Sequence, residues 1–241
     1  MSPRPRQLVL DLPARPALGR EAFYITPSNA LALAQIDAWP DWPEGRMAVT
    51  GPTGSGKTHL THVWAARARA RILQARDLAR TDPLDIPADA ALAVEDADTL
   101  PRARDGRGAE EVLFHLCNRL RTGGGTLLVT GRNAPARWGL RLPDLASRLG
   151  VAGVARLEPP DDELLSAVLL KLFADRQVEV SPDLVDYLLP RMERSFSGAK
   201  ALVGELDRAA LSRKRQITPR LAAEVLKRQD GSSGNAPGTA H

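Results

Sequence analysis

Hydrophobic and polar positions follow two spacings in the first 160 residues of the chain. Uninterrupted apolar runs lie at 46–50, 90–95 and 126–130, with a weaker one at 72–74. Runs of this length predict strands that are buried on both faces. Between and before these runs, apolar residues recur with helical spacing at 29–39, 58–70 and 110–121. Strands that alternate with helices are typical of a parallel α/β sheet.

After about residue 160 the spacing is helical throughout. It covers three segments, 161–176, 181–192 and 197–214. Ser181-Pro182 and Thr218-Pro219 each pair a capping residue with Pro at the first helical position. We therefore expect a small all-helical domain after Pro159-Pro160.

Composition along the chain predicts four parts. Residues 1–20 are rich in Pro and Arg and are expected to form an extended arm, followed by an α/β domain over 21–159. The helical domain is then expected over 160–228. The polar segment 229–241 is rich in Gly and Pro, and it is expected to be disordered.

Charge and cysteine content exclude several classes of protein. The 33 Lys and Arg exceed the 29 Asp and Glu only slightly, and so mild an excess does not by itself predict binding of nucleic acid, for which a localised basic patch is expected. A single cysteine excludes a disulfide framework or a Cys-rich metal site, and it fits a cytoplasmic setting. The sequence contains no apolar run of about 18 residues, so we expect no membrane span, and no signal peptide is recognisable.

The strongest chemical motif is GPTGSGKT at residues 51–58, between a predicted strand and a predicted helix. It fits the phosphate-binding pattern G-x-x-x-x-G-K-[ST]. Lys57 is expected to place a positive charge near the β- and γ-phosphates, and Thr58 to offer a hydroxyl to Mg²⁺. We therefore expect ADP or ATP with Mg²⁺ to bind at the loop residues and the histidine after them: Gly51, Pro52, Thr53, Gly54, Ser55, Gly56, Lys57, Thr58 and His59.

Two further strand ends are expected to complete this site. Glu95 and Asp96 follow the apolar run at 90–95. One acid is expected to hold Mg²⁺, for which Glu95 joins Thr58, and the other to polarise the attacking water. Thr130 ends the next strand and is expected to contact the γ-phosphate or that water. A solvated strand end is the alternative interpretation of the two acids.

The segment QLVLDL, residues 7–12, allows two interpretations. Its imperfect alternation is compatible with a short edge strand. Alternatively it is an extended peptide that binds a partner. In that case Gln7 would form a hydrogen bond at the rim of a pocket, and Leu8, Leu10 and Leu12 would fill apolar sites.

The order of the motifs resembles that of the AAA+ ATPases of the DnaA family. The resemblance rests on GKTHL, the acidic pair, the strand ending in Thr and LPDLASRL at 142–149, and it extends over residues 20–228. It implies an AAA+ parallel sheet with helices on both faces, followed by a small helical lid domain. Regulatory relatives carry an N-terminal Q-x-x-L-x-L peptide for the DNA polymerase sliding clamp, so the resemblance favours the peptide interpretation of residues 7–12.

The resemblance also implies roles for single residues. Arg148 matches the arginine finger that acts on a neighbour's γ-phosphate. Phe23, Tyr24 and Ile25 match the segment that lines the adenine. Lys200 stands where a lid helix usually presents Arg to the phosphates, which keeps the charge but loses the planar fork. Two further departures are Glu95, where Asp is usual, and Arg132, where initiators tend to have an acid.

Together these features favour a regulatory AAA+ protein, associated with the bacterial nucleoid and replisome. It would bind DnaA and the DNA-loaded clamp, touching DNA only indirectly, and stimulate hydrolysis of DnaA-bound ATP while its own turnover stays low. The chain stops short of the helix-turn-helix domain of initiators, so we do not expect origin binding. The alternatives are a self-sufficient ATPase such as a helicase loader, or a small-molecule kinase. Because AAA+ sites are commonly shared between subunits, the resemblance also allows a homo-oligomer.

Overall fold

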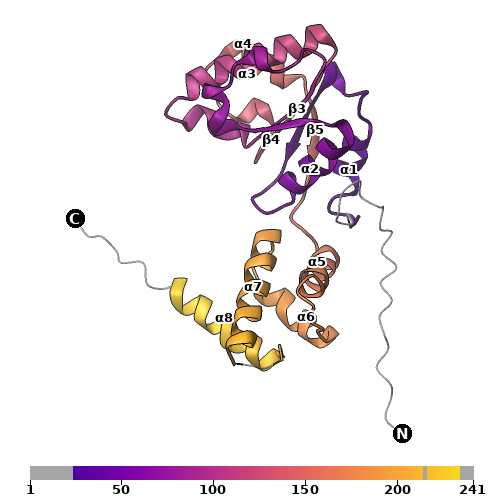
Figure 1. Ribbon diagram of the computed structural model, residues 1–241, viewed down its shortest axis with the longest axis vertical. Coiled ribbons are helices and arrows are strands. Elements are labelled where there is room, and N and C mark those ends of the chain that lie inside the picture. The colour runs from indigo at the N-terminus through magenta and orange to yellow at the C-terminus, as the bar shows by residue number, and fades with distance from the viewer. Residues whose placement is uncertain (1–23, 214–215, 234–241) are drawn as a thin grey trace, which may run out of the picture.

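The computed structural model describes residues 24–213 and 216–233 in two domains, a sheet-containing domain and a helical one (Figure 1). A single connecting segment near Pro159 joins them. The arm with its peptide 7–12 and Phe23 lies outside the described residues, and so does 234–241.

In the described chain the sheet has five parallel strands in the order β2-β3-β4-β1-β5. The strands are β1 (Arg46–Thr50), β2 (Arg71–Gln74), β3 (Ala91–Glu95), β4 (Thr126–Gly131) and β5 (Gly153–Arg156). Ala48 of β1 pairs with Val129 of β4 and with Val154 of β5. The continuous apolar runs therefore form the centre of the sheet, as expected for strands covered on both faces.

The edge strand β5 was not among the predicted strands. Its sequence GVAR has one fully buried residue, Ala155, between exposed Val154 and Arg156. An edge strand with one covered face gives only a short alternation, which is too weak to predict a strand by itself.

Helices cover both faces of the sheet, α3 and α4 on one side and α1 and α2 on the other (Figure 1). The first four helices are α1 (Ala30–Asp37), α2 (Lys57–Ala68), α3 (Gly106–Gly123) and α4 (Pro143–Gly150). Alternate residues of β1 divide between the two cores: Ala48 faces α3 and α4, and Met47 and Val49 face α1 and α2. Two buried tryptophans pack together in the second of these cores, with the rings of Trp42 and Trp64 centred 5.0 Å apart.

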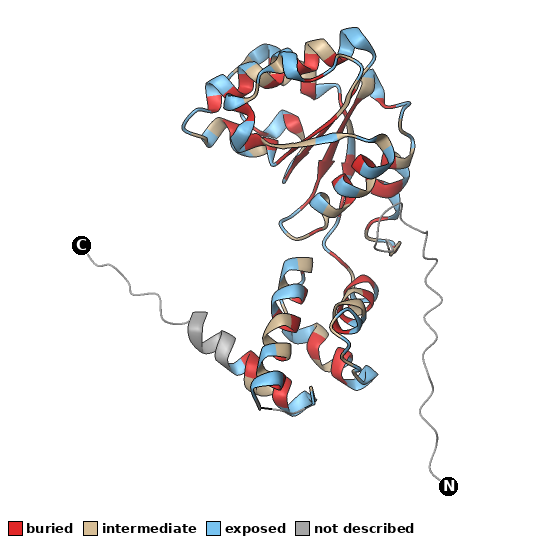
Figure 2. Cartoon of the chain, in the orientation of Figure 1, coloured by how far each residue is buried: buried red, intermediate tan, exposed pale blue. Residues whose placement is uncertain are grey.

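The helical domain has a core of its own, as the red segments of Figure 2 show. It consists of α5 (Asp162–Ala174), α6 (Pro182–Leu188), α7 (Phe196–Arg213) and α8 (Pro219–Ser233). Phe173, Leu184 and Leu206 are wholly buried within it. The segment expected to be a tail, 229–241, overlaps this domain, because the backbone of α8 stays helical through Ser233. Extending an existing helix costs far less free energy than starting one.

Asp161 fastens the junction between the domains. Its carboxylate accepts a hydrogen bond from Leu164 N at 2.8 Å, which caps α5, and another from Ser28 N at 3.3 Å. Partial burial works to raise the pKa of this carboxyl, but these hydrogen bonds and that of Thr26 outweigh it and leave the pKa below its ordinary value. The ionised form of Asp161 therefore holds the helical domain to the segment before α1.

Among the described residues, no helix combines the length and the apolar character that crossing a membrane requires.

Candidate nucleotide-binding site

The phosphate-binding loop lies between the carboxyl end of β1 and the first turn of α2. Gly54 and Gly56 adopt φ values of +76° and +95°, a region that side chains disfavour. A Cβ on Gly56 would lie only 2.6 Å from Cε2 of Phe196. The glycines are therefore needed both for the left-handed turn and for the close approach of α7.

Lys57 is folded back onto its own loop. Its Nζ donates to the carbonyl oxygens of Gly51 and Pro52, at 2.9 and 2.8 Å. Burial lowers the pKa of Lys57, although Asp96 and Asp98 oppose the shift. The ammonium group of Lys57 is thus hydrogen-bonded to main-chain carbonyls, and an anionic ligand can replace these carbonyls as its partner.

The start of α7 is joined to the loop by the main chain. Phe196 N donates to Gly54 O at 3.1 Å. Ser195 beside it is 2% exposed, donates to Glu193 Oε1 at 2.7 Å and accepts from Gly198 N at 2.8 Å. This hydrogen-bonded turn sets the first residues of α7 against the phosphate loop.

The two predicted acids occupy different environments. Glu95 is 4% exposed, and its Oε2 accepts from Gln74 Nε2 at 2.6 Å, while its buried Oε1 has no hydrogen-bond partner. Asp96 is exposed, takes the left-handed region with φ +57° and lines the pocket. The strand end therefore separates a buried carboxylate from one that faces solvent.

Thr130 is 1% exposed and lies outside the pocket wall. Its Oγ1 accepts a hydrogen bond from Asp96 N at 2.9 Å. In this arrangement Thr130 orients the acidic turn. On the pocket side, Asp98 Oδ2 accepts from Arg132 N at 3.1 Å, and both residues line the pocket.

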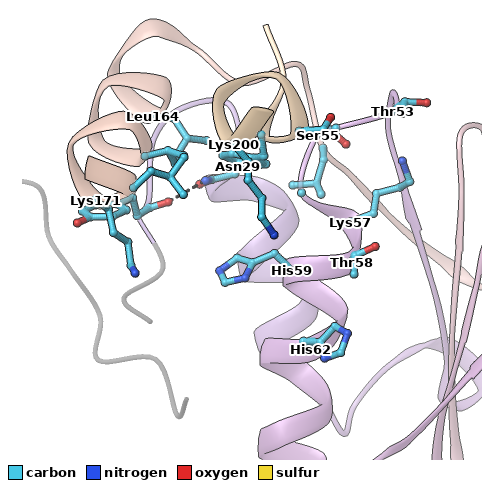
Figure 3. A pocket seen from close by; sticks show the side chains of 18 of the residues that line it. Asn29, Thr53, Ser55, Lys57, Thr58, His59, His62, Leu164, Lys171 and Lys200 are labelled. Carbon is cyan, nitrogen blue, oxygen red and sulfur yellow. Dashed lines mark hydrogen bonds between the residues drawn. The ribbon is translucent and has the colours of Figure 1, made fainter. Parts of the chain in front are cut away.

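A pocket of about 920 Å³ lies between the two domains. Figure 3 shows Lys57 and Thr58 at the start of α2 on one side, with Lys171 and Lys200 from the helical domain among the residues opposite. From the predicted set, the pocket is lined by Tyr24, Thr53, Gly54, Ser55, Gly56, Lys57, Thr58, His59, Asp96 and Lys200. The lining does not include Gly51, Pro52, Ile25, Glu95, Thr130 or Arg148.

One end of the pocket is mostly apolar. Leu157, Leu164 and Val168 line it beside Tyr24. Asn29 fixes this end, since its Nδ2 donates to Tyr24 O at 2.8 Å and its Oδ1 accepts from Thr26 N at 3.0 Å. An apolar slot next to a phosphate loop is suited to the base of a nucleotide.

Several pocket residues were not predicted from the sequence. Asn29, Asp98 and Phe196 belong to no phosphate-binding pattern, and they reach the pocket only through the fold. For Asp98 a signal was present, since it closes the acidic stretch VEDAD, but nothing distinguished it from a turn residue.

The donor set fits a nucleotide and its cation. The glycine cradle leaves space that Cβ atoms would fill, and the hydroxyl of Ser55 and Oε1 of Glu95 are buried without a hydrogen-bond partner. The described residues contain no cluster of three or more His, Cys, Asp or Glu side chains that could hold a metal. Mg²⁺ would therefore depend mainly on the phosphates and Thr58, because Glu95, the other expected ligand, is buried and does not line the pocket.

Arg148 lies on α4, away from this pocket. Its carbonyl oxygen accepts from Arg46 Nη1 at 3.0 Å, and Arg46 begins β1 whereas the phosphate loop follows the end of β1. The intervening strand spans about 13 Å at 3.3 Å per residue. The main chain of Arg148 thus lies near the amino end of β1, at the opposite end of that strand from the phosphate loop.

No protein-family model matches the sequence, but solved structures resemble the fold. Domain III of the replication initiation protein DnaA from Thermotoga maritima has a TM-score of 0.73 at 18% identity, covering 89% of this chain and 98% of that domain. AMPPCP-bound DnaA from Aquifex aeolicus has a TM-score of 0.66 at 16% identity, covering 88% of this chain and 68% of that one.

The Holliday junction branch migration motor RuvB of Thermotoga maritima is also similar, with a TM-score of 0.57 at 18% identity over 76% of this chain and 61% of that one. At these identities the likeness establishes the fold. The chain has the DnaA-like AAA+ fold, a five-stranded parallel sheet covered by helices and followed by a helical domain.

Proposed function

We propose that this protein is a nucleotide-binding AAA+ regulator of the Hda kind, which binds the sliding clamp on DNA and stimulates hydrolysis of the ATP held by DnaA. Negative regulation of replication initiation would follow. The observation that carries the proposal is the separation of Arg148 from the pocket of its own chain. A finger so placed acts on a nucleotide held by another subunit.

Binding of ADP or ATP is supported by the pocket between the domains. The loop main chain and Lys57 would hold the phosphates, with Lys200 reaching them from α7, and the apolar end beside Tyr24 would take the base. A DnaA structure with the same fold is bound to AMPPCP, which supports this assignment. When bound, Mg²⁺ would neutralise phosphate charge.

Clamp binding is proposed from the sequence of residues 7–12. Gln7, Leu8, Leu10 and Leu12 match the Q-x-x-L-x-L form, and nearby prolines favour an extended chain that loses little entropy on binding. Through the clamp the protein would reach DNA indirectly, in the cytoplasm and at the replisome. Shared AAA+ sites also make self-association part of this proposal.

The test measures hydrolysis of labelled ATP bound to DnaA, with and without DNA-loaded clamp. We expect clamp-dependent stimulation that Arg148→Ala lowers by roughly 10³-fold or more, the size of finger effects. The matched control is Arg137→Ala, since Arg137 lies on a short turn outside the pocket wall and α4. Full stimulation by Arg148→Ala would refute the finger assignment.

A second variant, Gln7→Ala with Leu10→Ala, tests the clamp peptide. We expect clamp capture to be lost while nucleotide affinity stays unchanged. Unaltered clamp affinity would contradict the peptide assignment.

A self-sufficient ATPase, for example a helicase loader, is the second candidate. It is favoured by Asp96, an exposed carboxylate on the pocket wall where it could polarise water. Rapid turnover by the isolated chain, abolished in Asp96→Asn, would support this candidate over the regulator. We expect slow turnover instead.

A further inference from the structure

Two ionisable side chains are buried beside the two ends of α4, away from the nucleotide pocket. Arg46 is 3% exposed and Glu110 is 0% exposed. Neither contributes to the pocket wall. Burying a charge is costly unless hydrogen bonds compensate it, so each of these side chains calls for an explanation.

Glu110 serves the beginning of α4 from the neighbouring helix α3. Its Oε2 accepts from both Arg141 N and Leu142 N at 2.8 Å. Leu142, the residue that caps α4, has no side-chain oxygen, and Pro143 after it has no N–H. The carboxylate of Glu110 thus holds the main chain of the two residues that lead into α4, and not the N–H groups of its first turn.

Arg46 serves the end of α4 from the sheet. Its Nη1 donates to Arg148 O at 3.0 Å and its Nη2 to Cys117 O of α3 at 3.5 Å. A guanidinium beside the last carbonyls of a helix complements the negative end of the helix dipole. One carboxylate and one guanidinium therefore match the two ends of this eight-residue helix in sign.

The residue whose carbonyl Arg46 holds is Arg148 itself. The neighbouring residues Leu145 and Leu149 are 0% and 1% exposed, so the inner face of α4 is fixed by packing. Arg148 is partly buried between that face and solvent. The Arg46 hydrogen bond fixes the main chain from which the Arg148 guanidinium extends.

We propose that Arg46 and Glu110 are positioning residues that lock α4, so that Arg148 is presented in one orientation to the γ-phosphate of a partner AAA+ subunit. The proposal rests on the proposed finger role of Arg148. Its consequence is that the rate of the stimulated reaction depends on two side chains that touch neither nucleotide nor partner.

The experiment compares Arg46→Met with Arg119→Met in the full chain. Arg119 is the matched control, because its Nε also donates to a main-chain carbonyl on α3's side of the sheet, that of Ile86 at 2.7 Å, but not to α4. Three quantities are measured: stimulated hydrolysis of DnaA-bound ATP against protein concentration, affinity for a fluorescent ADP analogue, and hydrogen exchange of the peptide 143–150.

For Arg46→Met we expect the maximal stimulated rate to fall roughly 10- to 100-fold, the cost of a displacement of about 1 Å. The half-saturating concentration and the ADP-analogue affinity should change less than about twofold, because the phosphate loop lies at the other end of β1. Exchange in 143–150 should accelerate. Arg46→Lys should restore part of the rate, since it keeps the positive charge, and Arg119→Met should leave the rate unchanged.

A folded Arg46→Met protein with the rate of Arg119→Met, or with unchanged exchange in 143–150, would overturn the proposal. If Arg46→Met does not fold, Glu110→Leu decides in the same way, because it removes the acceptor for Arg141 N and Leu142 N and keeps a side chain of similar size. Should Arg148→Ala stimulate fully, the finger assignment fails by itself. In that case accelerated exchange of α4 in Arg46→Met would still support the lock, and unchanged exchange would reject it.

Discussion

The two ends of β1 hold their functional groups in opposite ways. At the carboxyl end, glycines and main-chain groups form an open loop, and Lys57 is satisfied by the loop's own carbonyls. At the amino end, the buried guanidinium of Arg46 holds the last turn of a short helix through the carbonyl of Arg148. A site that receives a ligand needs groups that exchange partners, whereas a residue offered to another protein gains from being fixed.

The largest effect on nucleotide affinity is expected at the carboxyl end of β1, from Lys57→Met. The substitution keeps the length of the side chain but removes the charge-assisted contacts to phosphate. We expect nucleotide affinity to fall by about 100-fold or more, since such contacts contribute about 1.5–3 kcal/mol each. Calorimetric titration with ADP measures it, and Arg67→Met serves as control because Arg67 pairs with Asp37 at the surface. Retained affinity would show that the main chain alone holds the phosphates.

A smaller effect is expected from Gly56→Ala, which tests the contact between loop and lid. Its Cβ would meet the ring of Phe196, and the left-handed φ of +95° costs about 1–2 kcal/mol for a side chain. We expect nucleotide affinity to fall about 30-fold, and Phe196→Leu in the same chain to recover the part due to the ring. Gly204→Ala is the control, because a Cβ at Gly204 meets nothing within 4 Å. Equal affinities for the two alanine variants would contradict the close approach.

The smallest effect concerns Cys117, near Arg46. Burial raises the pKa of this thiol to about 12, although Arg46 and Arg148 work to lower it. Because the pKa in the folded protein lies above the ordinary 9.0, the neutral thiol leaves the free energy of unfolding at its full value below pH 9. As pH rises from 9 toward 12, the thiol ionises in the unfolded chain first, and the free energy of unfolding falls. By pH 10 the thiol should lower the free energy of unfolding by about 1.4 kcal/mol.

Urea unfolding at pH 8 and pH 10 checks this shift against Cys117→Ala, which should lose less stability between the two values. The thiol should also resist alkylation at pH 8 until the chain unfolds. Rapid alkylation of the folded protein, or equal pH dependence of both chains, would mean that the α4 side of the sheet opens as readily as the pocket.

Sequence reasoning predicted the elements that are buried on both sides and the motif whose chemistry is local. The central strands and the phosphate loop fall in this group. The edge strand β5 was missed because a single covered face leaves a short pattern. Arg46 and Glu110 were not recognised, because charge at the first residue of a strand or in the first turns of a helix is normally solvated. In the fold, α4 covers the side chains of Arg46 and Glu110, and no local sequence pattern indicates this burial.

The placement of Lys57 and Thr130 could not be predicted either. A motif predicts which groups contact a ligand, but it does not predict which hydrogen bonds those groups form within the protein. Lys57 donates to a carbonyl of its own loop, and Thr130 accepts from Asp96 N, because donors and acceptors that are shielded from water pair with neighbouring groups of the protein.

The bond between Phe196 N and Gly54 O has an evolutionary consequence. It joins lid and phosphate loop through main chain alone, so almost any residue can occupy position 196 without removing it. Only proline lacks the donor. Selection can thus exchange exposed side chains of α7, including the lysine at position 200, without removing the main-chain link between the domains.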